Sequence, residues 1–336
     1  MATIKDVARL AGVGLGTASR VVTSKGSFSA DAADRVQAAV KQLGFRPSNI
    51  ARALSSQRSG TIGVYVPDFK GPFYGPMLHA IDQELRLHGR HMVAANGCGH
   101  EDVRQQALDG VQLLIDRECD GMILTTNALR DADFAQIRQR FPNLAVVNRE
   151  VRGMKALCFS VDHRLAGQLA AQALVSNGHK RIAVISGPQE AGDNRQRLQG
   201  FFEVLEKRGI TREQVTLIEA NFAASGGWEA ASRLLGRGTR FTGLFCANDQ
   251  MAMGAMSRLH AAGVAVPGDV SVVGYDDAEV ATYLAPRLTS VHIAIDDMGL
   301  NACRLLLNQC YQSELAVSHA FQPTLVMRES VAKVGR

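Results

Sequence analysis

The residues that could do chemistry are polar side chains that follow short apolar runs of the chain. Carboxylates and amides hydrogen-bond to vicinal hydroxyls, arginine forks onto adjacent oxygens, and an aromatic ring covers an apolar sugar face. These side chains are Asp68, Asn148, Arg149, Arg195, Arg197, Asn248, Asp249, Asp276 and Asp277, with Phe73, Tyr74, Phe222 and Trp228 near them. A single such residue is more often a helix cap, and we expect Asp249 and Asp277 to be caps. Recurrence after successive runs favours a binding site.

The apolar runs have the lengths of β-strands and alternate with helical stretches over residues 61–336, which we call the body. This alternation predicts two doubly wound α/β subdomains, each a parallel sheet covered on both faces. The segments LTSVHIA, 295–310 and TLVMRE are expected to cross between the subdomains, which makes a hinged clamshell with a cleft. Ligands of such sheets bind beyond the carboxyl ends of the strands. The polar side chains are therefore predicted to lie at the cleft.

The first residues of the chain predict two short helices joined by a tight turn. Thr3 and Asp6 have the spacing of a capping box. Apolar residues recur at helical spacing over residues 4–11, Gly12 follows, and a second helix is expected over 15–22. This pattern is typical of a DNA-binding helix-turn-helix. The alternative is an ordinary helical hairpin of a larger core.

The positive charge of the chain is concentrated in the same region. Residues 1–58 carry nine Lys or Arg and three Asp, a net charge of +6, whereas the whole chain has +5, so the remainder carries −1. A concentrated basic segment is the electrostatic signature of a nucleic-acid binder; the alternative is a solvated charged surface. A third helix should begin after Ser29 and end at Gly44. Residues 48–60 have the length of a two-turn helix that forms only against DNA or a partner, or of a plain linker.

Composition argues against other classes of protein. We find no apolar run of about 18 residues and no apolar signal-peptide core, so we expect neither a membrane span nor export. The six cysteines are widely spaced without a CxxC pair, which suits reduced thiols in a cytoplasm.

No catalytic or metal-binding motif is found. The GxGxG pattern at 12–16 lacks a preceding strand, and neither a Walker A sequence nor a GxSxG elbow is present. His88 with His91, and Cys98 with His100, lack a second pair of ligands. We expect no enzyme activity, no cofactor and no metal.

Residues 3–54, with TIKDVARLAGV, TASRVV and RVQAAVKQLGFRPSNIARAL, resemble the DNA-binding region of the lactose/galactose repressor family of bacterial transcription regulators. The resemblance continues through the body in PFYGPM, RLQGF, FCANDQMAMGAM, GYDD and FQPTLVMRES, which are closest to the galactose-repressor branch. It implies a cytoplasmic, nucleoid-associated homodimer that binds double-stranded operator DNA and a small effector, a hexose or glycoside. The alternatives are a solute-binding protein of a sugar transporter and a sugar-converting enzyme.

The resemblance also implies an organisation of the chain. By this resemblance the chain is expected to divide into a headpiece (1–47), a hinge helix with linker (48–60), an N-terminal effector subdomain (61–160 plus 292–321), a C-terminal effector subdomain (161–291 plus 322–330) and a tail (331–336). The second helix enters the major groove, and paired hinge helices bend the site with a leucine at its centre.

The resemblance finally implies which residues bind. The expected DNA contacts are Thr3, Leu15, Gly16, Thr17, Ser19, Arg20, Ser29, Asn49, Ala53 and Leu54. The expected effector contacts are Asp68, Phe73, Tyr74, Asn148, Arg149, Arg197, Phe222, Asn248 and Asp276. The chain departs from the family at Gly14, where serine usually caps the recognition helix. Because Leu15 and Gly16 carry no polar side chain, base readout would depend on Arg20 and on apolar contact with thymine methyls.

Overall fold

A computed structural model of the chain describes residues 2–23, 26–45, 58–97, 102–238 and 240–334. It divides into two compact units, Met1–Thr61 with Glu118–Asp120, and Ile62–Arg117 with Gly121–Arg336. In the described ranges, no helix combines the length and the apolar character that crossing a membrane requires. The first unit holds the headpiece and the second holds nearly all of the body.

The headpiece contains three helices, α1 (Ile4–Ala11), α2 (Leu15–Thr23) and α3 (Ala30–Leu43). The Thr3 hydroxyl accepts a hydrogen bond from the backbone of Asp6, whose side chain accepts one from the backbone of Thr3, so the predicted capping box is present. Gly12 ends α1 with φ of 63°, a left-handed conformation that favours glycine. Val7, Ala18 and Val36, one from each helix, are fully buried. The predicted helix-turn-helix is confirmed.

The first lobe of the body is a five-stranded sheet in the order β2-β1-β3-β4-β5. Its strands are β1 (Thr61–Val66), β2 (His91–Asn96), β3 (Gly121–Leu124), β4 (Leu144–Val147) and β5 (Cys158–Phe159). Its helices are α5 (Tyr74–Leu87), α6 (Val103–Asp116), α7 (Asp131–Arg140) and the 3-10 turn η1 (Lys155–Leu157). The pairs β1–β3, β3–β4 and β4–β5 are parallel, as the alternation of strands and helices predicts.

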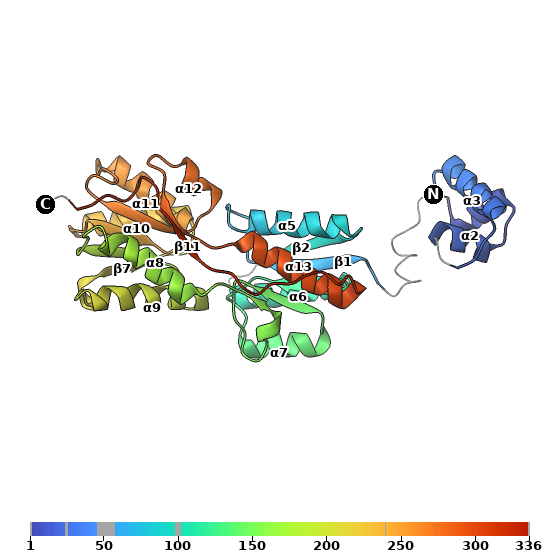
Figure 1. Cartoon of the computed structure of the whole chain (residues 1–336), viewed down its shortest axis with the longest axis horizontal. Helices are drawn as coiled ribbons and strands as arrows, with labels where there is room; N and C mark the ends of the chain where they lie inside the picture. Colours follow the sequence, from blue (N-terminus) through green and yellow to red (C-terminus); the bar gives the residue numbers. More distant parts are fainter. Residues whose placement is uncertain (1, 24–25, 46–57, 98–101, 239, 335–336) are drawn as a thin grey trace. The chain divides into compact units, whose positions relative to one another are not determined.

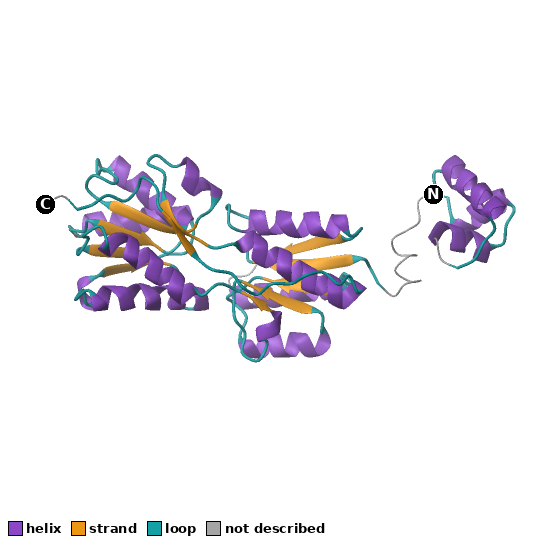
Figure 2. Cartoon of the chain, in the orientation of Figure 1, coloured by secondary structure: helices purple, strands orange, loops and turns teal. Residues whose placement is uncertain are grey.

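The second lobe is a six-stranded sheet in the order β11-β10-β9-β8-β6-β7, parallel except for β11. Its strands are β6 (Ile182–Ser186), β7 (Thr216–Glu219), β8 (Gly243–Cys246), β9 (Ser271–Asp276), β10 (Thr289–His292) and β11 (Thr324–Val326). Its helices are α8 (His163–Val175), α9 (Gly192–Lys207), η2 (Arg212–Gln214), α10 (Ala224–Gly236), α11 (Asp249–Ala261) and α12 (Glu279–Tyr283). The two-lobed α/β fold is confirmed (Figure 2).

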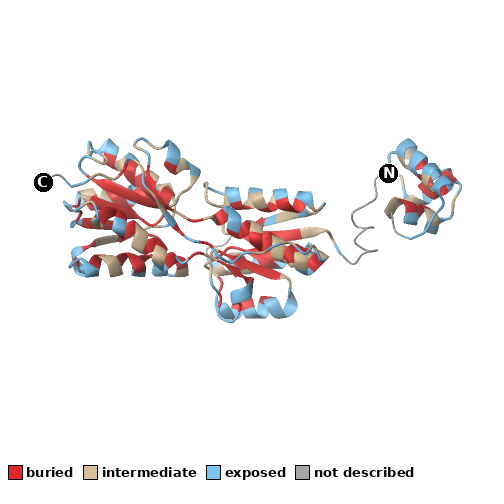
Figure 3. Cartoon of the chain, in the orientation of Figure 1, coloured by how far each residue is buried: buried red, intermediate tan, exposed pale blue. Residues whose placement is uncertain are grey.

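The chain crosses between the lobes three times. It passes from β5 to α8, then from β10 to α13 (Ile295–Tyr311), which packs against α5, β3 and β4 of the first lobe, and it returns to the second sheet at β11 (Figure 1). The strands are largely buried, and the outward faces of the helices are exposed (Figure 3). Apolar packing of the buried strands therefore fixes the positions of their carboxyl ends in both sheets.

Helices α8 and α9 pack unusually closely. A Cβ atom on Gly167 of α8 would overlap the carbonyl oxygen of Arg197, and one on Gly200 of α9 would overlap that of Arg164. Only glycine fits at these two contacts. The close approach sets the position of the α9 turn that carries Arg197.

Candidate functional site

The strand-end region, by which we mean the residues after the carboxyl ends of strands in both lobes, brings the two lobes together. Asn127, after β3, donates a hydrogen bond of 2.8 Å to the Asp193 carboxylate in the first turn of α9. A Cβ atom on Gly71, after β1, would overlap the side chain of Gln250 in α11. Strand ends of opposite lobes are therefore in contact at two places.

Arg197 lies near the start of α9 and is only 2% exposed. Its guanidinium carbon lies 3.4 Å from the centre of the Tyr275 ring, at the end of β9. It donates to the carbonyl oxygen of Ala247 after β8, and Asp193 lies at 3.4 Å. The ends of β8 and β9 and the first turn of α9 thus meet at one buried cation, and we call Arg197 with Asp193, Ala247 and Tyr275 the Arg197 cluster.

Three buried polar side-chain atoms have no hydrogen-bond partner among the described residues, and all three lie in the strand-end region. They are Asn148 Oδ1 after β4, Ser186 Oγ at the end of β6, and Arg197 Nε. An unsatisfied buried polar group costs roughly 1–3 kcal/mol. Such atoms favour a ligand that offers both donors and acceptors, because Arg197 donates, Asn148 Oδ1 accepts and the serine hydroxyl does either.

Asp276 closes β9 with φ of 105°, an unusual backbone conformation for a residue other than glycine. Burial raises the pKa of its carboxyl well above the ordinary value, against the opposite effect of Arg197. Asp276 therefore lies in an environment of low polarity beside the arginine.

The prediction that Asp249 and Asp277 are helix caps is wrong. Asn248 is the N-cap of α11 and accepts from the backbone of Met251 at 2.9 Å, whereas the fully buried carboxylate of Asp249 accepts from Ser290 and from the backbone of Ala278. The N-cap of α12 is Ala278.

Asp277 instead pairs with Arg328 at 2.6 Å and with His292 at 3.3 Å. Asp249 and Asp277 therefore bind residues that are remote in the sequence, and spacing alone does not reveal such partners.

Two predicted effector residues already have protein partners for their polar groups. The Asn248 amide donates to the carbonyl oxygen of Phe222 at 2.9 Å while its oxygen caps α11. The Arg149 guanidinium pairs with Asp131 at 3.2 Å and donates to the carbonyl of Leu129. These side chains hold the loops of the site in place.

A hollow of about 550 Å3 opens between the lobes beside this region. Of the predicted effector residues, only Asn148 and Arg149 line it. The hollow is also lined by Asp193, His163 of α8 and Asn127. The remaining predicted residues are placed by other contacts.

The aromatic residues come from two lobes. Phe73 and Tyr74, at the start of α5, have ring centres 4.9 Å apart in an edge-to-face arrangement. The pKa of Tyr74 is raised by burial and then by the carboxylates of Asp193, Asp68 and Asp276. Tyr74 of the first lobe therefore lies near Asp193 and Asp276 of the second lobe, and near Asp68 of its own lobe.

Asp68 and Phe222 complete the predicted set. Asp68 accepts from the backbone of Lys70 at 2.7 Å in the loop after β1. Phe222 has φ of 64°, and its ring lies so close to Gly187 that a Cβ atom there would overlap it. Trp228 is 40% exposed. Arg195 lines the hollow and donates to the carbonyl oxygens of Gln189 and Glu190.

Sequence reasoning missed five residues of the region, one of which is Ser186 at the end of β6. Asp193 and Asn127 form the bond between the lobes, and His163 Nδ1 lies 2.7 Å from the hydroxyl of Tyr275 beside Arg197. The same pattern could have identified Asn127 and Asp193, since both follow apolar runs of strand length. No local pattern distinguishes His163 or Tyr275 from ordinary core residues.

The second predicted surface is on the headpiece. Leu15, Gly16, Ser19 and Arg20 of α2 are exposed, Leu15 by 47%, and Arg20 donates to the Thr17 hydroxyl at 3.3 Å. The backbone of Gly14, with no side-chain cap, accepts the first hydrogen bonds of α2.

The remaining predicted DNA contacts serve as caps or fall outside the description. Thr3 caps α1, and Ser29 caps α3 by accepting from the backbone of Ala32 at 3.2 Å. Asn49, Ala53 and Leu54, with the predicted hinge helix, lie outside the described residues.

Comparison with known proteins gives both parts of the chain counterparts. The family model described as bacterial regulatory proteins, lacI family, matches residues 3–48, and the periplasmic binding protein-like domain matches residues 171–331. The HTH-type transcriptional regulator GalR of Escherichia coli K12 is 36% identical over 333 residues, which are 99% of this chain and 96% of GalR.

Two solved structures support the same relationship. A transcriptional regulator of the LacI family from Burkholderia phymatum is 46% identical, with a TM-score of 0.80 over 81% of this chain and 99% of that one. The lac repressor dimer bound to operator and the anti-inducer ONPF is 26% identical, with a TM-score of 0.86 over 98% and 99% of the two chains. The chain belongs to the lacI family of bacterial regulatory proteins, on its galactose-repressor-like branch.

Proposed function

We propose that this DNA-binding transcriptional regulator is a homodimeric repressor whose operator affinity is set by a sugar bound in the strand-end region. The observation that carries the effector site is the set of three buried polar atoms without partners, on Asn148, Ser186 and Arg197. They come from both lobes. A hydroxyl donates and accepts at once, so a polyhydroxylated ligand matches a mixed set of donors and acceptors.

The ligand we propose is a neutral hexose or glycoside. Arg197 and Asp276 would hold adjacent hydroxyls, with Asn148 and Asp68 on the side of the first lobe. Phe73, Tyr74 and Phe222 would cover apolar ring faces, and Arg149 and Asn248 would contact the ligand at the rim while they hold their loops. Arg197 already pairs with Asp193 and lies beside Asp276, so this cation does not favour an anionic sugar over a neutral one.

Control of DNA affinity would come from the lobes. A ligand shifts an equilibrium only by its differential affinity for two states. Because the proposed contacts come from both lobes and the Asn127–Asp193 bond joins them, a ligand here would favour one arrangement of the lobes over another. We propose that this arrangement orders or melts the hinge segment, residues 49–56.

On the DNA side, α2 would enter the major groove, with Arg20 reading base edges, Leu15 and Gly16 lying against thymine methyls, and Thr17 and Ser19 holding phosphates. Thr3 and Ser29 would reach phosphates from the ends of their helices. Asn49, Ala53 and Leu54 would contact the minor groove. Each headpiece would read one half of a pseudo-palindrome.

The alternatives receive less support. Residues 3–48 match a family of regulators and form a helix-turn-helix, which the function of a solute-binding protein of a transporter does not require. The curated relative GalR is a transcriptional regulator, and we propose that this chain likewise has no enzymatic activity. Its proposed place of action is the bacterial cytoplasm, on the nucleoid.

The effector site is tested by thermal shift of the full-length protein against hexoses, pentoses, disaccharides and purines. We expect a sugar to raise the melting temperature, and Asn148→Ala to abolish this rise. The control variant His79→Asn, at an exposed histidine of α5, should keep the rise. A purine that stabilises the protein, or a sugar effect insensitive to Asn148→Ala, would contradict the proposed site.

The DNA surface is tested with a duplex selected by the full-length protein from a random library. The logarithm of the affinity should fall linearly with the logarithm of the salt concentration, with a slope of about −0.9 per phosphate contacted. Leu54→Ala should weaken binding of this duplex without changing the thermal shift by the sugar. Unchanged DNA affinity in that variant would make residues 48–60 a plain linker.

A further inference from the structure

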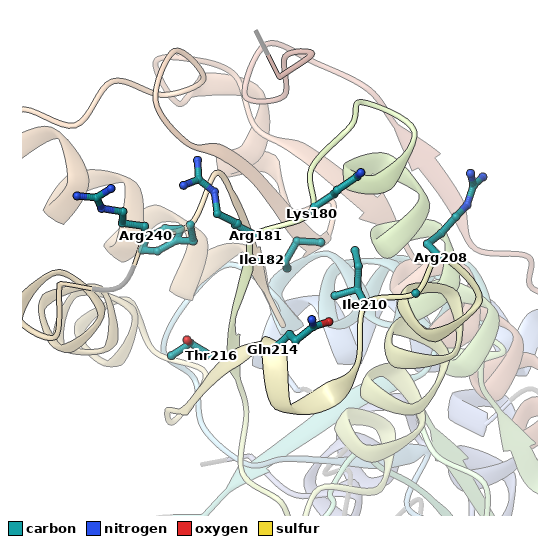
Figure 4. A pocket seen from close by; sticks show the side chains of 10 residues that line it. Lys180, Arg181, Ile182, Arg208, Ile210, Gln214, Thr216 and Arg240 are labelled. Carbon is teal, nitrogen blue, oxygen red and sulfur yellow. The ribbon is translucent and has the colours of Figure 1, made fainter. Parts of the chain in front are cut away.

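A second hollow lies at the opposite edge of the second lobe from the sugar site. It has a volume of about 390 Å3 and is formed where β6, β7 and β8 begin, rather than where they end (Figure 4). Small-molecule pockets usually measure roughly 300–1,000 Å3. The hollow is therefore large enough for a small ligand.

The rim of this hollow is strongly basic. Lys180 and Arg181 precede β6, Arg208 follows α9, and Arg240 precedes β8. No acidic residue is among the described residues that line it. All four cations are exposed, so their charged ends are available to a ligand from solvent.

The four cations lack the acidic partners that some surface arginines of the same lobe have. Arg164 pairs with Glu203 at 2.7 Å, and Arg287 pairs with Glu329 at 2.7 Å. Within the described ranges, the side chains of Lys180, Arg181, Arg208 and Arg240 make no ion pair and no hydrogen bond. The cluster thus holds several like charges that the protein itself does not neutralise.

The base of the hollow is apolar. Ile182, Ile210 and Phe241 line it and are buried to 2%, 7% and 8% exposure, and Thr216 and Gln214 add polar groups at its side. Walls of low polarity strengthen the field of charges placed above them. An anion at the mouth would therefore be attracted more strongly than on a flat surface.

We propose that this hollow binds a small molecule that carries two phosphate groups. Figure 4 shows Arg181 and Arg240 toward one side of the hollow and Lys180 and Arg208 toward the other. Guanidinium groups bind phosphate through paired, charge-assisted hydrogen bonds. Two pairs of cations match two anionic groups.

The test uses the full-length protein and pyrophosphate, measured by isothermal titration calorimetry at low salt. We expect saturable binding of one pyrophosphate per chain, at least about tenfold tighter than binding of orthophosphate. Arg181→Gln with Arg240→Gln should weaken pyrophosphate binding at least about tenfold, which is about 1.4 kcal/mol.

The matched control is Arg138→Gln with Arg140→Gln, two exposed arginines of α7 in the first lobe. It should leave pyrophosphate binding unchanged, and both double variants should keep the thermal shift by the sugar. Absence of saturable binding, equal affinity for orthophosphate and pyrophosphate, or equal weakening in the two double variants would each overturn the proposal.

Discussion

Acidification should destabilise the body through one buried histidine. The ring of His163 is 2% exposed and its Nδ1 lies 2.7 Å from the hydroxyl of Tyr275. Burial lowers the pKa of His163 from 6.5 to about 4, and the nearby Arg197 guanidinium acts in the same direction. The folded body therefore holds this imidazole neutral at pH values where the unfolded chain protonates it.

The sign and size of the effect follow from this difference. Between pH 6.5 and about 4, the unfolded chain binds a proton that the folded protein does not, so stability falls as the pH falls. One pKa unit corresponds to about 1.4 kcal/mol, so the difference between 6.5 and about 4 corresponds to roughly 3 kcal/mol. Other groups act differently: burial raises the pKa of Asp249 to about 7, which opposes the loss. The His163 contribution must therefore be measured as a difference between variants.

The measurement is urea unfolding of the wild type and of His163→Asn at pH 7, 6, 5 and 4. Asparagine places an amide near the position of Nδ1 but does not titrate. We expect the wild type to lose about 3 kcal/mol more than His163→Asn over this range, and His79→Asn, at an exposed histidine, to behave as the wild type. Parallel stability curves for the wild type and His163→Asn would refute the argument.

Two further predictions concern the Arg197 cluster and the headpiece. Arg197→Met should lower the free energy of unfolding of the body by roughly 3–5 kcal/mol, because it leaves the Asp193 carboxylate without its cation. Adding Asp193→Asn should restore part of this loss. If urea unfolding shows no recovery in the double variant, the lost ion pair is not the cause. Arg195→Met, in the same turn but exposed, is the control for Arg197→Met. Thr3→Ala should destabilise the headpiece by about 1 kcal/mol through loss of the α1 cap, which is measured as a lower melting temperature of the helical signal of the headpiece. Thr23→Ala, outside any N-cap, should lower this melting temperature less.

The headpiece was predictable almost completely from its sequence. The capping box of Thr3 and Asp6, the end of α1 at Gly12 and the start of α3 after Ser29 all depend on residues within four positions of one another. Such interactions are encoded in spacing, and no distant partner changes them. The alternation of strands and helices in the body was readable for the same reason.

The roles of the polar residues at strand ends were less predictable. Asn248 and Asp249 are neighbours in sequence, yet Asn248 caps α11 and Asp249 binds Ser290, 41 residues later. Spacing restricts which residues reach a strand end, but which side chain caps, braces or stays without a partner depends on what the other strands bring beside it.

The Arg197 cluster illustrates the physical reason most clearly. Alternation in the sequence sufficed to predict parallel sheets, and with them the edge at which a ligand binds. The stacking of Arg197 on Tyr275, the bond of Tyr275 to His163 and the bond of Asn127 to Asp193 join residues between 66 and 112 positions apart. Local periodicity carries no information about such pairs, because their distances are fixed by the order of strands in a sheet and by the packing of one helix on another.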